Sequence, residues 1–591
     1  MPSHLNLRDF LQELRKSEEI VDVYHPVDPD LELAEIHRRV AAVNGPALFF
    51  HHVKNSSFPV VTNLFGSLKR VKLAFPNHPE QVIAQLVQMI SKNFPPKWNL
   101  LWKNRQLLKN CLYLGTKKSK HGPIKAVHCH PPNLNKIPML KTWPMDGGHF
   151  ITLPLVYTES PEARIPNLGM YRIQRYNATE AGLHFQIQKG GGFHFYQAEK
   201  ENQPLPVSIF IGGPPALMLS AIAPLPENIS ETMICGLIQG KKLDVCHSPY
   251  TSHPLISECE FALIGNAQPH IRRLEGPFGD HYGYYSLKHP FPVFTCDAIY
   301  HRKDAIYPAT IVGKPRQEDF YIGNYLQELL SPLFPLVMPG VKALWSYGET
   351  GFHSLSAAVV QERYYRESMV SAFRILGEGQ LALTKFLLLT NQTVDLRNFR
   401  AVLTIILERF SPETDLFVFS NLSLDTLDYT GPSLNQGSRG VMLGIGEKQR
   451  DLPNIYQGQL PLTLRKAHPF SPGCLVVEGE FNETLFAYEG FKDWPLIILV
   501  DNIEQTIKSE TAFLWTVFTR FEPAADLYAK KQVIRNHIAY SGPLLIDARM
   551  KKNYPDELSC DLETKNHVTK HWNTYFPNGM EMGDSETAHL N

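Results

Sequence analysis

The sequence predicts a mixed α/β (α+β) protein built in three parts, and three observations carry this prediction. The first part shows helical spacing, the middle part shows short β-type runs separated by glycine and proline, and the last part contains an internal repeat. A chain of 591 residues has room for two or three domains with substantial cores. We expect an N-terminal α/β domain over residues 1–130, a sheet domain over 131–325, an α/β domain over 326–556 and a frayed polar tail over 557–591.

The N-terminal part mixes helical and extended patterns. Apolar residues recur at helical spacing over residues 7–14 and 31–43. Residues 47–50 and 60–62 are short apolar runs of the kind found in buried strands. The proline-rich stretch 131–144 then predicts a domain boundary.

The middle part is dominated by short β-type runs. They cover residues 151–157, 207–211, 256–264 and 292–299, and glycine and proline punctuate the chain between them. Many short strands separated by turns favour a sheet-dominated barrel or sandwich.

The last part contains two copies of one pattern at an offset of 111 residues. Residues 388–391 match 499–502, residues 409–416 match 520–527, and residues 430–432 match 541–543. Each copy has the pattern strand, helix, strand, which suits an α/β layer. Two copies are too few for a solenoid, so we predict an α/β domain built on a duplicated unit.

Composition excludes several classes of protein. Lys+Arg and Asp+Glu balance at 58 each, which argues against nucleic-acid binding driven by phosphate neutralisation. No apolar run approaches the roughly 18 residues that span a bilayer. The eight cysteines are scattered without a Cys-x-x-Cys pair, which favours reduced thiols. We therefore expect a cytoplasmic protein, soluble or peripheral to a membrane.

The segment 275–285 is the most informative stretch of the chain. Glu275 and Asp280 lie five positions apart across a Gly-Pro corner, and a histidine and three tyrosines follow within the next five residues. Glycine and proline at this spacing break helices and long strands, so the two acids belong to a shaped loop. Such a loop is either a surface turn with two solvated acids or part of an active site.

Polar residues also gather around Asn167 and Arg172. The amide of Asn167 offers an oxygen to a metal, and the guanidinium of Arg172 suits carboxylate or phosphate recognition. Residues five apart on a regular strand face opposite sides. These two can share a site only if the backbone bends at Gly169, and the same holds for Glu275 and Asp280 across their corner.

Two further segments each allow a functional and a structural interpretation. The glycine run that follows Lys189 is either a phosphate-binding turn or a flexible hairpin. Ser230 suits the N-cap of a helix that begins near Glu231, whose carboxylate would then only complement the helix dipole.

Taken together, these segments resemble the UbiD family of prenylated-flavin-dependent decarboxylases. The resemblance rests on the motifs at residues 167–172, 224–231 and above all 275–280, and it covers most of the chain. It implies an N-terminal α/β piece, a central FMN-binding split β-barrel and a C-terminal α/β domain involved in oligomerisation. It also implies prenylated FMN supplied by a flavin prenyltransferase, a divalent metal (Mn²⁺ or Mg²⁺) and K⁺.

The resemblance assigns roles to individual residues. Arg172 would orient the carboxylate of an aromatic acid, Glu275 would pair with Arg172, and Asp280 would protonate the carbon that loses CO₂. A carboxyl group that donates a proton near neutral pH needs a raised pKa, which we expect burial to supply. The implied metal ligands are Asn167, Glu231 and the residue at position 188. The implied cofactor-binding residues are Met170, Tyr171, Arg172, His184, Phe185, Gln186, Lys189 and Gly190.

The sequence departs from the family pattern at two positions. Gln188 stands where related sequences commonly have a metal-binding histidine, and a neutral amide is a weaker ligand. Arg439 stands where a lysine near the cofactor is more usual, and its planar fork differs from a point ammonium.

Within the family, the length and the C-terminal repeat resemble the longer branch assigned to menaquinone synthesis. The expected substrate is therefore a naphthoate, bare or prenylated, and the alternative is 3-polyprenyl-4-hydroxybenzoate of the ubiquinone branch. Two other functions remain open from the sequence: an FMN-dependent oxidoreductase, and a non-catalytic cofactor-binding protein.

Overall fold

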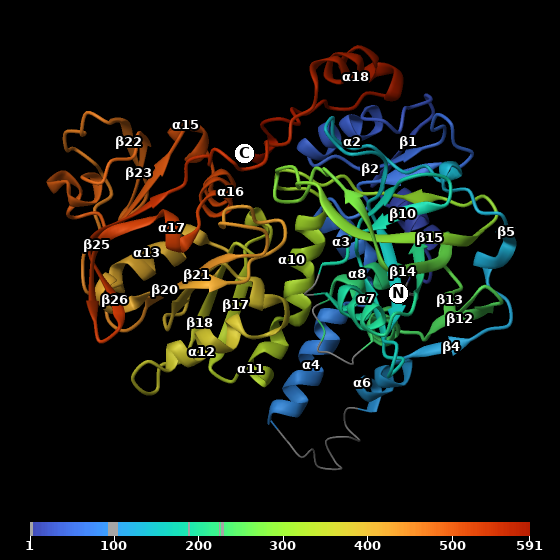
Figure 1. Ribbon diagram of the computed structural model, residues 1–591, viewed down its shortest axis with the longest axis horizontal. Helices are drawn as coiled ribbons and strands as arrows, with labels where there is room; N and C mark the ends of the chain where they lie inside the picture. Colours follow the sequence, from blue (N-terminus) through green and yellow to red (C-terminus); the bar gives the residue numbers. More distant parts are fainter. Residues whose placement is uncertain (1–3, 93–104, 187–188, 224, 226–229, 591) are drawn as a thin grey trace. The chain divides into compact units, whose positions relative to one another are not determined.

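The computed structural model describes residues 4–92, 105–186, 189–223, 225 and 230–590 (Figure 1). The chain forms two compact units. The first contains Met1–Leu329 and Glu557–Ala588, and the second contains Leu330–Asp556 and His589–Asn591. In the described part of the chain, no helix is long and apolar enough to cross a membrane.

The N-terminal region folds as its sequence pattern predicts. Helices α1 (Leu7–Lys16) and α2 (Glu32–Ala42) and strands β2 (Ala47–Phe50) and β3 (Val60–Thr62) match the expected segments. Strands β1 (Ile20–Val23) and β16 (Tyr307–Pro308) complete a sheet of order β1-β2-β3-β16. The last strand of this sheet therefore comes from the middle of the chain, which local patterns do not reveal.

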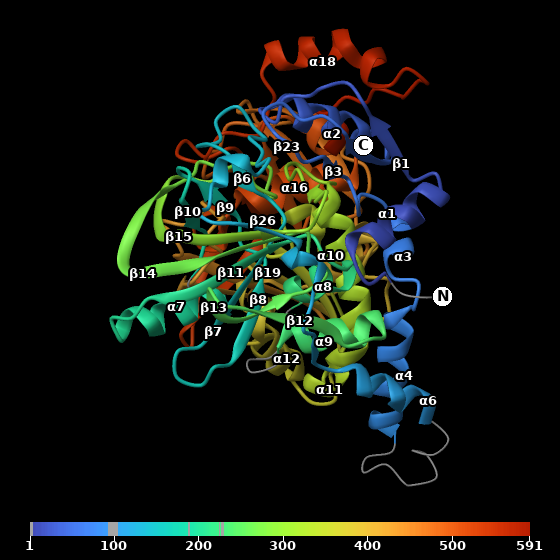
Figure 2. The same ribbon diagram turned by 90° about the vertical axis from the view of Figure 1, so that its right-hand side faces the viewer.

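The middle region is built on an open nine-stranded sheet. Its order is β6-β9-β10-β15-β14-β11-β7-β8, and β5 pairs with β15. Its strands are β5 (Val127–Cys129), β6 (Phe150–Ile151), β7 (Pro154–Glu159), β8 (Pro166–Gly169), β9 (Ile173–Arg175), β10 (Glu180–Leu183), β11 (Leu205–Ile211), β14 (Phe261–Glu275) and β15 (His289–His301). Figure 2 shows β14 and β15 as a long curved pair, and the two strands lie in the middle of the strand order.

A three-stranded sheet of order β13-β12-β4 lies in the same unit. Its strands are β4 (Thr116–Lys118), β12 (Leu243–Ser248) and β13 (Thr251–Ile256). The single strand predicted over residues 256–264 is wrong. Strand β13 ends at Ile256, and β14 begins at Phe261 after a turn. The predicted run therefore belongs to two strands in different sheets.

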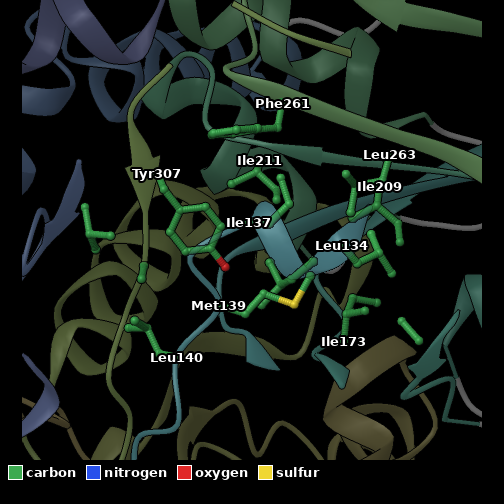
Figure 3. Close-up of a cluster of buried hydrophobic side chains, with 14 of the residues drawn as sticks. Leu134, Ile137, Met139, Leu140, Ile173, Ile209, Ile211, Phe261, Leu263 and Tyr307 are labelled. Carbon is green, nitrogen blue, oxygen red and sulfur yellow. The ribbon is translucent and has the colours of Figure 1, made fainter. Parts of the chain in front are cut away.

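The core of the first unit lies between the large sheet and the segments that cover it (Figure 3). The proline-rich segment contributes directly, because Leu134 and Leu140 are fully buried in this core. Other described helices of this unit are α3 (Leu68–Ala74), α4 (Pro79–Lys92), α6 (Arg105–Lys109), α7 (Gly190–Lys200), α8 (Pro215–Ile222), α9 (Glu231–Gln239) and α10 (Glu318–Leu330).

The second unit confirms the internal duplication. Its two five-stranded sheets have the orders β17-β18-β19-β21-β20 and β22-β23-β24-β26-β25. Along each order the pairings run antiparallel, parallel, parallel, antiparallel. The first sheet contains β17 (Val341–Ser346), β18 (Leu355–Val360), β19 (Phe386–Thr390), β20 (Leu416–Leu422) and β21 (Gly437–Gly444). The second contains β22 (Leu464–Ser471), β23 (Cys474–Gly479), β24 (Leu496–Val500), β25 (Leu527–Ile534) and β26 (His537–Asp547).

Helices α13 (Phe399–Arg409) and α16 (Glu510–Arg520) occupy equivalent places in the two copies. The other helices are α11 (Phe334–Val337), α12 (Glu367–Leu376), α14 (Pro412–Asp415), α15 (Ile503–Thr506) and α17 (Pro523–Asp526). One of the three sequence matches is not structurally equivalent. Residues 430–432 precede β21, whereas residues 541–543 lie inside β26, so this match does not mark corresponding positions.

The segment after residue 556 is not a frayed tail. It forms helix α18 (Leu562–Tyr575), which packs against α2 in the first unit. Val568, Trp572 and Tyr575 are buried, and the Tyr575 hydroxyl donates a hydrogen bond of 2.5 Å to Glu32. These apolar residues recur at helical spacing, but the polar residues between them hide the pattern.

We expect Trp572→Ala to destabilise the first unit by about 3–5 kcal/mol, because it removes a buried indole and leaves a cavity. The indole is 5% exposed and donates a hydrogen bond to the Met580 carbonyl. Chemical denaturation, followed by fluorescence, measures the change. Leu562→Ala on the same helix is the control, because Leu562 is 71% exposed and should matter little. Equal effects of the two substitutions would contradict the packing of α18.

Candidate active site

The predicted site forms around the guanidinium of Arg172, which binds both carboxylates of the 275–280 motif. Arg172 lies in the bend between β8 and β9, and Glu275 ends β14. Arg172 Nε donates to Glu275 Oε1 at 2.7 Å, and Nη2 donates to Oε2 at 3.0 Å. Arg172 Nη1 donates to Asp280 Oδ2. The bidentate pair with Glu275 fixes the plane of the guanidinium, so Asp280 meets its remaining edge.

The loop after Glu275 is closed by its own hydrogen bonds. Phe278 and Ser286 pair across it: Ser286 N donates to the Phe278 carbonyl at 2.8 Å, and Phe278 N donates to Ser286 Oγ at 3.1 Å. Asp280 N donates to the Tyr284 carbonyl at 3.1 Å. Ser286 Oγ also accepts from Arg172 Nη2 at 2.9 Å. The corner at Gly276 has φ +95°, a conformation that favours glycine. The active-site interpretation of this loop therefore fits better than a solvated turn.

Two histidines flank the carboxylates. His184 Nδ1 lies 3.2 Å from Glu275 Oε2, and its ring packs against Phe291. His281 contacts Asp280 twice, because its backbone N and its Nδ1 each lie 2.7 Å from Asp280 Oδ1. The two oxygens of Asp280 therefore have separate partners, Arg172 on one and His281 on the other.

The pKa values of Glu275 and Asp280 both lie below their ordinary values, whereas a raised pKa was expected for Asp280. Burial raises the pKa of Glu275, but the charges of Arg172 and His184 and their hydrogen bonds outweigh it, and the pKa falls to about 2. Burial likewise raises the pKa of Asp280, but the hydrogen bond from His281 and the charge of Arg172 lower it well below its ordinary value. The predicted raised pKa of Asp280 is therefore wrong for this arrangement, in which both acids are ionised.

Asp146 holds the loop in place and was not predicted from the sequence. Its Oδ1 accepts from Gly279 N at 2.8 Å, next to Asp280. Its Oδ2 accepts from the backbone N and hydroxyl of Thr142 and from Trp143 N. Burial raises the pKa of this carboxyl group. An aspartate followed by two glycines at the end of the proline-rich segment is the only local signal for this role.

Trp143 packs the same loop from its other side. A Cβ atom added at Gly279 would lie 2.1 Å from the indole, so a glycine is required there. Arg38 stacks on the Trp143 ring at 4.0 Å, and Leu558 and Tyr285 form a buried cluster with it. Leu558 N also donates to the Gly283 carbonyl at 3.0 Å. The returning C-terminal segment therefore takes part in shaping the site.

Glu231 contacts β8 at the residue that follows Asn167. Glu231 begins α9, and its Oε2 accepts from Leu168 N at 2.9 Å. Burial raises the pKa of Glu231 to about 6, and the hydrogen bond from Leu168 offsets only part of this effect. Ser230 is the N-cap residue as predicted, but its hydroxyl bonds Thr232 instead of the helix backbone. Glu231 thus does more than complement the helix dipole.

The glycine run is the N-terminus of α7 and not a hairpin. Lys189 is the N-cap residue, and Gly190 and Gly191 form the first turn. A Cβ atom at Gly190 would lie 2.0 Å from Asn167 Oδ1, so the helix start and the amide are in close contact. Tyr171 accepts from Gly191 N at 3.1 Å. The first turn of a helix can offer backbone N–H groups to an anion, and here it lies next to the side-chain oxygen of Asn167. These residues fit a flavin phosphate bridged to a hard cation.

Three other predicted cofactor residues lie in the same part of the first unit. Phe185 is buried against Tyr171 with ring centroids 5.2 Å apart, Gln186 Nε2 lies 3.4 Å from His184 Nε2, and Met170 is half-buried in the bend. Arg439 lies on β21 of the second unit, where it donates to the Leu376 and Ser423 carbonyls. Gln188 lies outside the described residues. Within those residues, no group of three or more His, Cys, Asp or Glu side chains is arranged to hold a metal.

The three tyrosines of the motif are all buried. Tyr282, Tyr284 and Tyr285 are between 2% and 5% exposed. Tyr285 accepts a hydrogen bond from Met145 N, and Tyr284 bridges to Glu557. Tyr284 and Tyr285 therefore serve the packing of the loop.

The sequence matches three family models for 3-octaprenyl-4-hydroxybenzoate carboxy-lyase UbiD. The N-terminal model covers residues 11–90, the Rift-related model covers 116–315 and the C-terminal model covers 320–444. A Chlamydia pneumoniae protein, named as one component of a 4-hydroxybenzoate decarboxylase, is 55% identical over 97% of this chain and 98% of its own length. An uncharacterized Archaeoglobus fulgidus protein is 33% identical over 77% of this chain and 94% of its own length.

Solved structures share the fold. The vanillic acid decarboxylase of Sedimentibacter hydroxybenzoicus in its closed form has a TM-score of 0.68 at 24% identity, covering 78% of this chain and 96% of that one. The UbiD-class enzyme HmfF from Pelotomaculum thermopropionicum, in complex with FMN, has a TM-score of 0.61 at 19% identity, covering 74% and 94%.

We expect Glu275→Gln to lower the free energy of unfolding by about 3–5 kcal/mol at neutral pH, because it breaks a buried ion pair. The pKa of Glu275 lies below its ordinary value of 4.5, at about 2. Its contribution is therefore fully present above pH 4.5 and is lost as the pH falls toward 2. Denaturant titrations of wild type and Glu275→Gln should show that the difference in their free energies of unfolding becomes smaller as the pH falls from 4.5 to about 2.

Glu489→Gln is the matched control for this substitution. Glu489 forms an exposed pair with Lys492, so its loss should leave the free energy of unfolding close to that of the wild type. A difference between wild type and Glu275→Gln that stays constant down to pH 2 would contradict the ion-pair assignment.

Proposed function

The chain belongs to the UbiD family of carboxy-lyases, and we propose that it decarboxylates an aromatic carboxylic acid of quinone biosynthesis without oxidation, using prenylated FMN. The observation that carries the proposal is the Arg172–Glu275–Asp280 cluster beside the Asn167–Glu231–Gly190 cradle. The 55% identity to the C. pneumoniae protein, named for 4-hydroxybenzoate decarboxylation, supports a hydroxylated aromatic acid as substrate. The candidate acids are a naphthoate of the menaquinone pathway, bare or prenylated, and 3-polyprenyl-4-hydroxybenzoate.

The cofactor would be held on the α7 side of the site. The first turn of α7 and Lys189 would bind its phosphate, and Asn167 and Glu231 would share Mn²⁺ or Mg²⁺ with that phosphate, with K⁺ nearby. Tyr171, Phe185 and Met170 would supply apolar contacts to the ring system. When bound, the prenylated flavin supplies the electron sink that loss of CO₂ from an aromatic acid requires.

The chain's own residues supply binding and proton transfer. Arg172 would orient the substrate carboxylate while Glu275 keeps its guanidinium in plane. Asp280, on the other edge of the guanidinium, would deliver a proton to the carbon that has lost CO₂. The protein would receive its cofactor from a flavin prenyltransferase and act as a homo-oligomer. A prenylated substrate would also require peripheral contact with a membrane.

Asp280→Asn should lower kcat about 10²–10⁴-fold, because the amide cannot donate the proton. The test uses protein co-produced with a flavin prenyltransferase and loaded with Mn²⁺, and measures CO₂ release from naphthoate and hydroxybenzoate acids. Bound flavin, read from the absorption spectrum, should be unchanged. Full activity of the variant would exclude Asp280 as the acid. Turnover with unmodified FMN and a nicotinamide donor would instead favour an oxidoreductase.

Glu231→Gln should weaken metal binding at least about 10–100-fold, the cost typical of changes around a metal site. Metal content by mass spectrometry and flavin retention after gel filtration measure this without any assay of turnover. Glu563→Gln is the control, because Glu563 is an exposed glutamate in the first turn of α18. Unchanged metal and flavin contents in Glu231→Gln would remove Glu231 from the ligand set.

A further inference from the structure

The proposed reaction consumes one proton from solvent in every turnover. The bond between the ring carbon and the carboxylate breaks, CO₂ leaves, and the carbon takes a proton from the Asp280 carboxyl group. Asp280 is 7% exposed and ionised in the arrangement described above. It must therefore be reprotonated through a group that reaches solvent before the next turnover.

His281 has the geometry for this task. Its Nδ1 lies 2.7 Å from Asp280 Oδ1, on the oxygen that Arg172 Nη1 does not bind. Its backbone N donates to the same oxygen and fixes the direction of approach. The His281 side chain is 26% exposed, so the imidazole joins the buried acid to the outside of the protein. An imidazole can both take up and release a proton near neutral pH.

Asp319 provides a second carboxylate near His281. It lies in the first turn of α10, and its Oδ1 is inaccessible to solvent, without a hydrogen-bond partner among the described residues. Burial raises the pKa of Asp319, whereas its interaction with His281 lowers it. The helix N-terminus alone would favour an acid here. Asp319 is thus a second titratable group close enough to His281 to interact with it electrostatically.

We propose that His281 transfers protons from solvent to Asp280. The inference rests on the proposed function. The imidazolium gives its Nδ1 proton to Asp280 Oδ1 and becomes neutral, and a proton from water restores it. Asp280 then gives the proton to the carbon. In sum, RCOO⁻ and H⁺ become RH and CO₂, with no oxidant or reductant consumed.

The test compares wild type and His281→Gln, each loaded with prenylated FMN and Mn²⁺. Glutamine can still donate a hydrogen bond to Asp280 but cannot carry a proton. His281→Gln should lower kcat about 10²-fold with KM and flavin content little changed. A His281→Ala variant should regain activity when imidazole is added, which a purely structural role would not produce.

His270→Gln is the control, because His270 is an exposed histidine that pairs with Glu199 away from the cluster. A kcat of His281→Gln within about twofold of wild type would overturn the relay. Loss of flavin from His281→Gln, together with no imidazole rescue of His281→Ala, would also overturn it by assigning His281 a structural role. If wild type itself releases no CO₂ from any acid tested while holding the cofactor, the proposed function fails, and the relay with it.

Discussion

The ion pairs of Arg172 with Glu275 and Asp280 are the constraint on which the site depends. A buried guanidinium is tolerated only with partners that satisfy its charge and its hydrogen bonds. The β8–β9 bend, the end of β14 and the loop that follows must therefore adopt their positions together. Asp146 and Trp143 hold that loop at Gly279, and Ser286 Oγ accepts a second hydrogen bond from Arg172 Nη2, which also donates to Glu275. The residues proposed for the chemistry therefore also hold these segments together.

Two carboxyl groups near β8 and β9, those of Glu275 and Glu231, have pKa values that shift in opposite directions. Glu275 is fully buried with a cation, and its pKa falls, whereas Glu231 is half-buried with one backbone N–H, and its pKa rises. The physical difference is the neighbouring positive charge. A divalent cation bound by Glu231 and Asn167 would lower the pKa of Glu231, as the charge of Arg172 lowers the pKa of Glu275. The charge of Glu275 is balanced by a residue of the chain itself, whereas Glu231 is suited to a cation that binds from solution.

Much of the fold follows from local patterns in the sequence. The first helices, β2, β3 and the duplicated strands of the second unit are visible as periodicity and repetition, because each pattern lies within a short window. Glu275 and Asp280 are visible because they share one motif. Asp146, Ser286 and Leu558 are not, since their roles arise from contacts between distant segments. Burial alone predicts a raised pKa for Asp280, but contacts with His281 and Arg172, which the sequence does not reveal, lower it.

The return of the chain to the first unit has a consequence for biosynthesis. The second unit is inserted between Leu329 and Glu557 of the first, and Leu558 contributes to the cluster around the site loop. A ribosome must therefore translate the whole second unit before the segment that supports the loop emerges. The nascent first unit lacks α18 and Leu558 throughout that interval. The loop that carries Asp280 therefore gains the support of Leu558 only after the second unit has been synthesised.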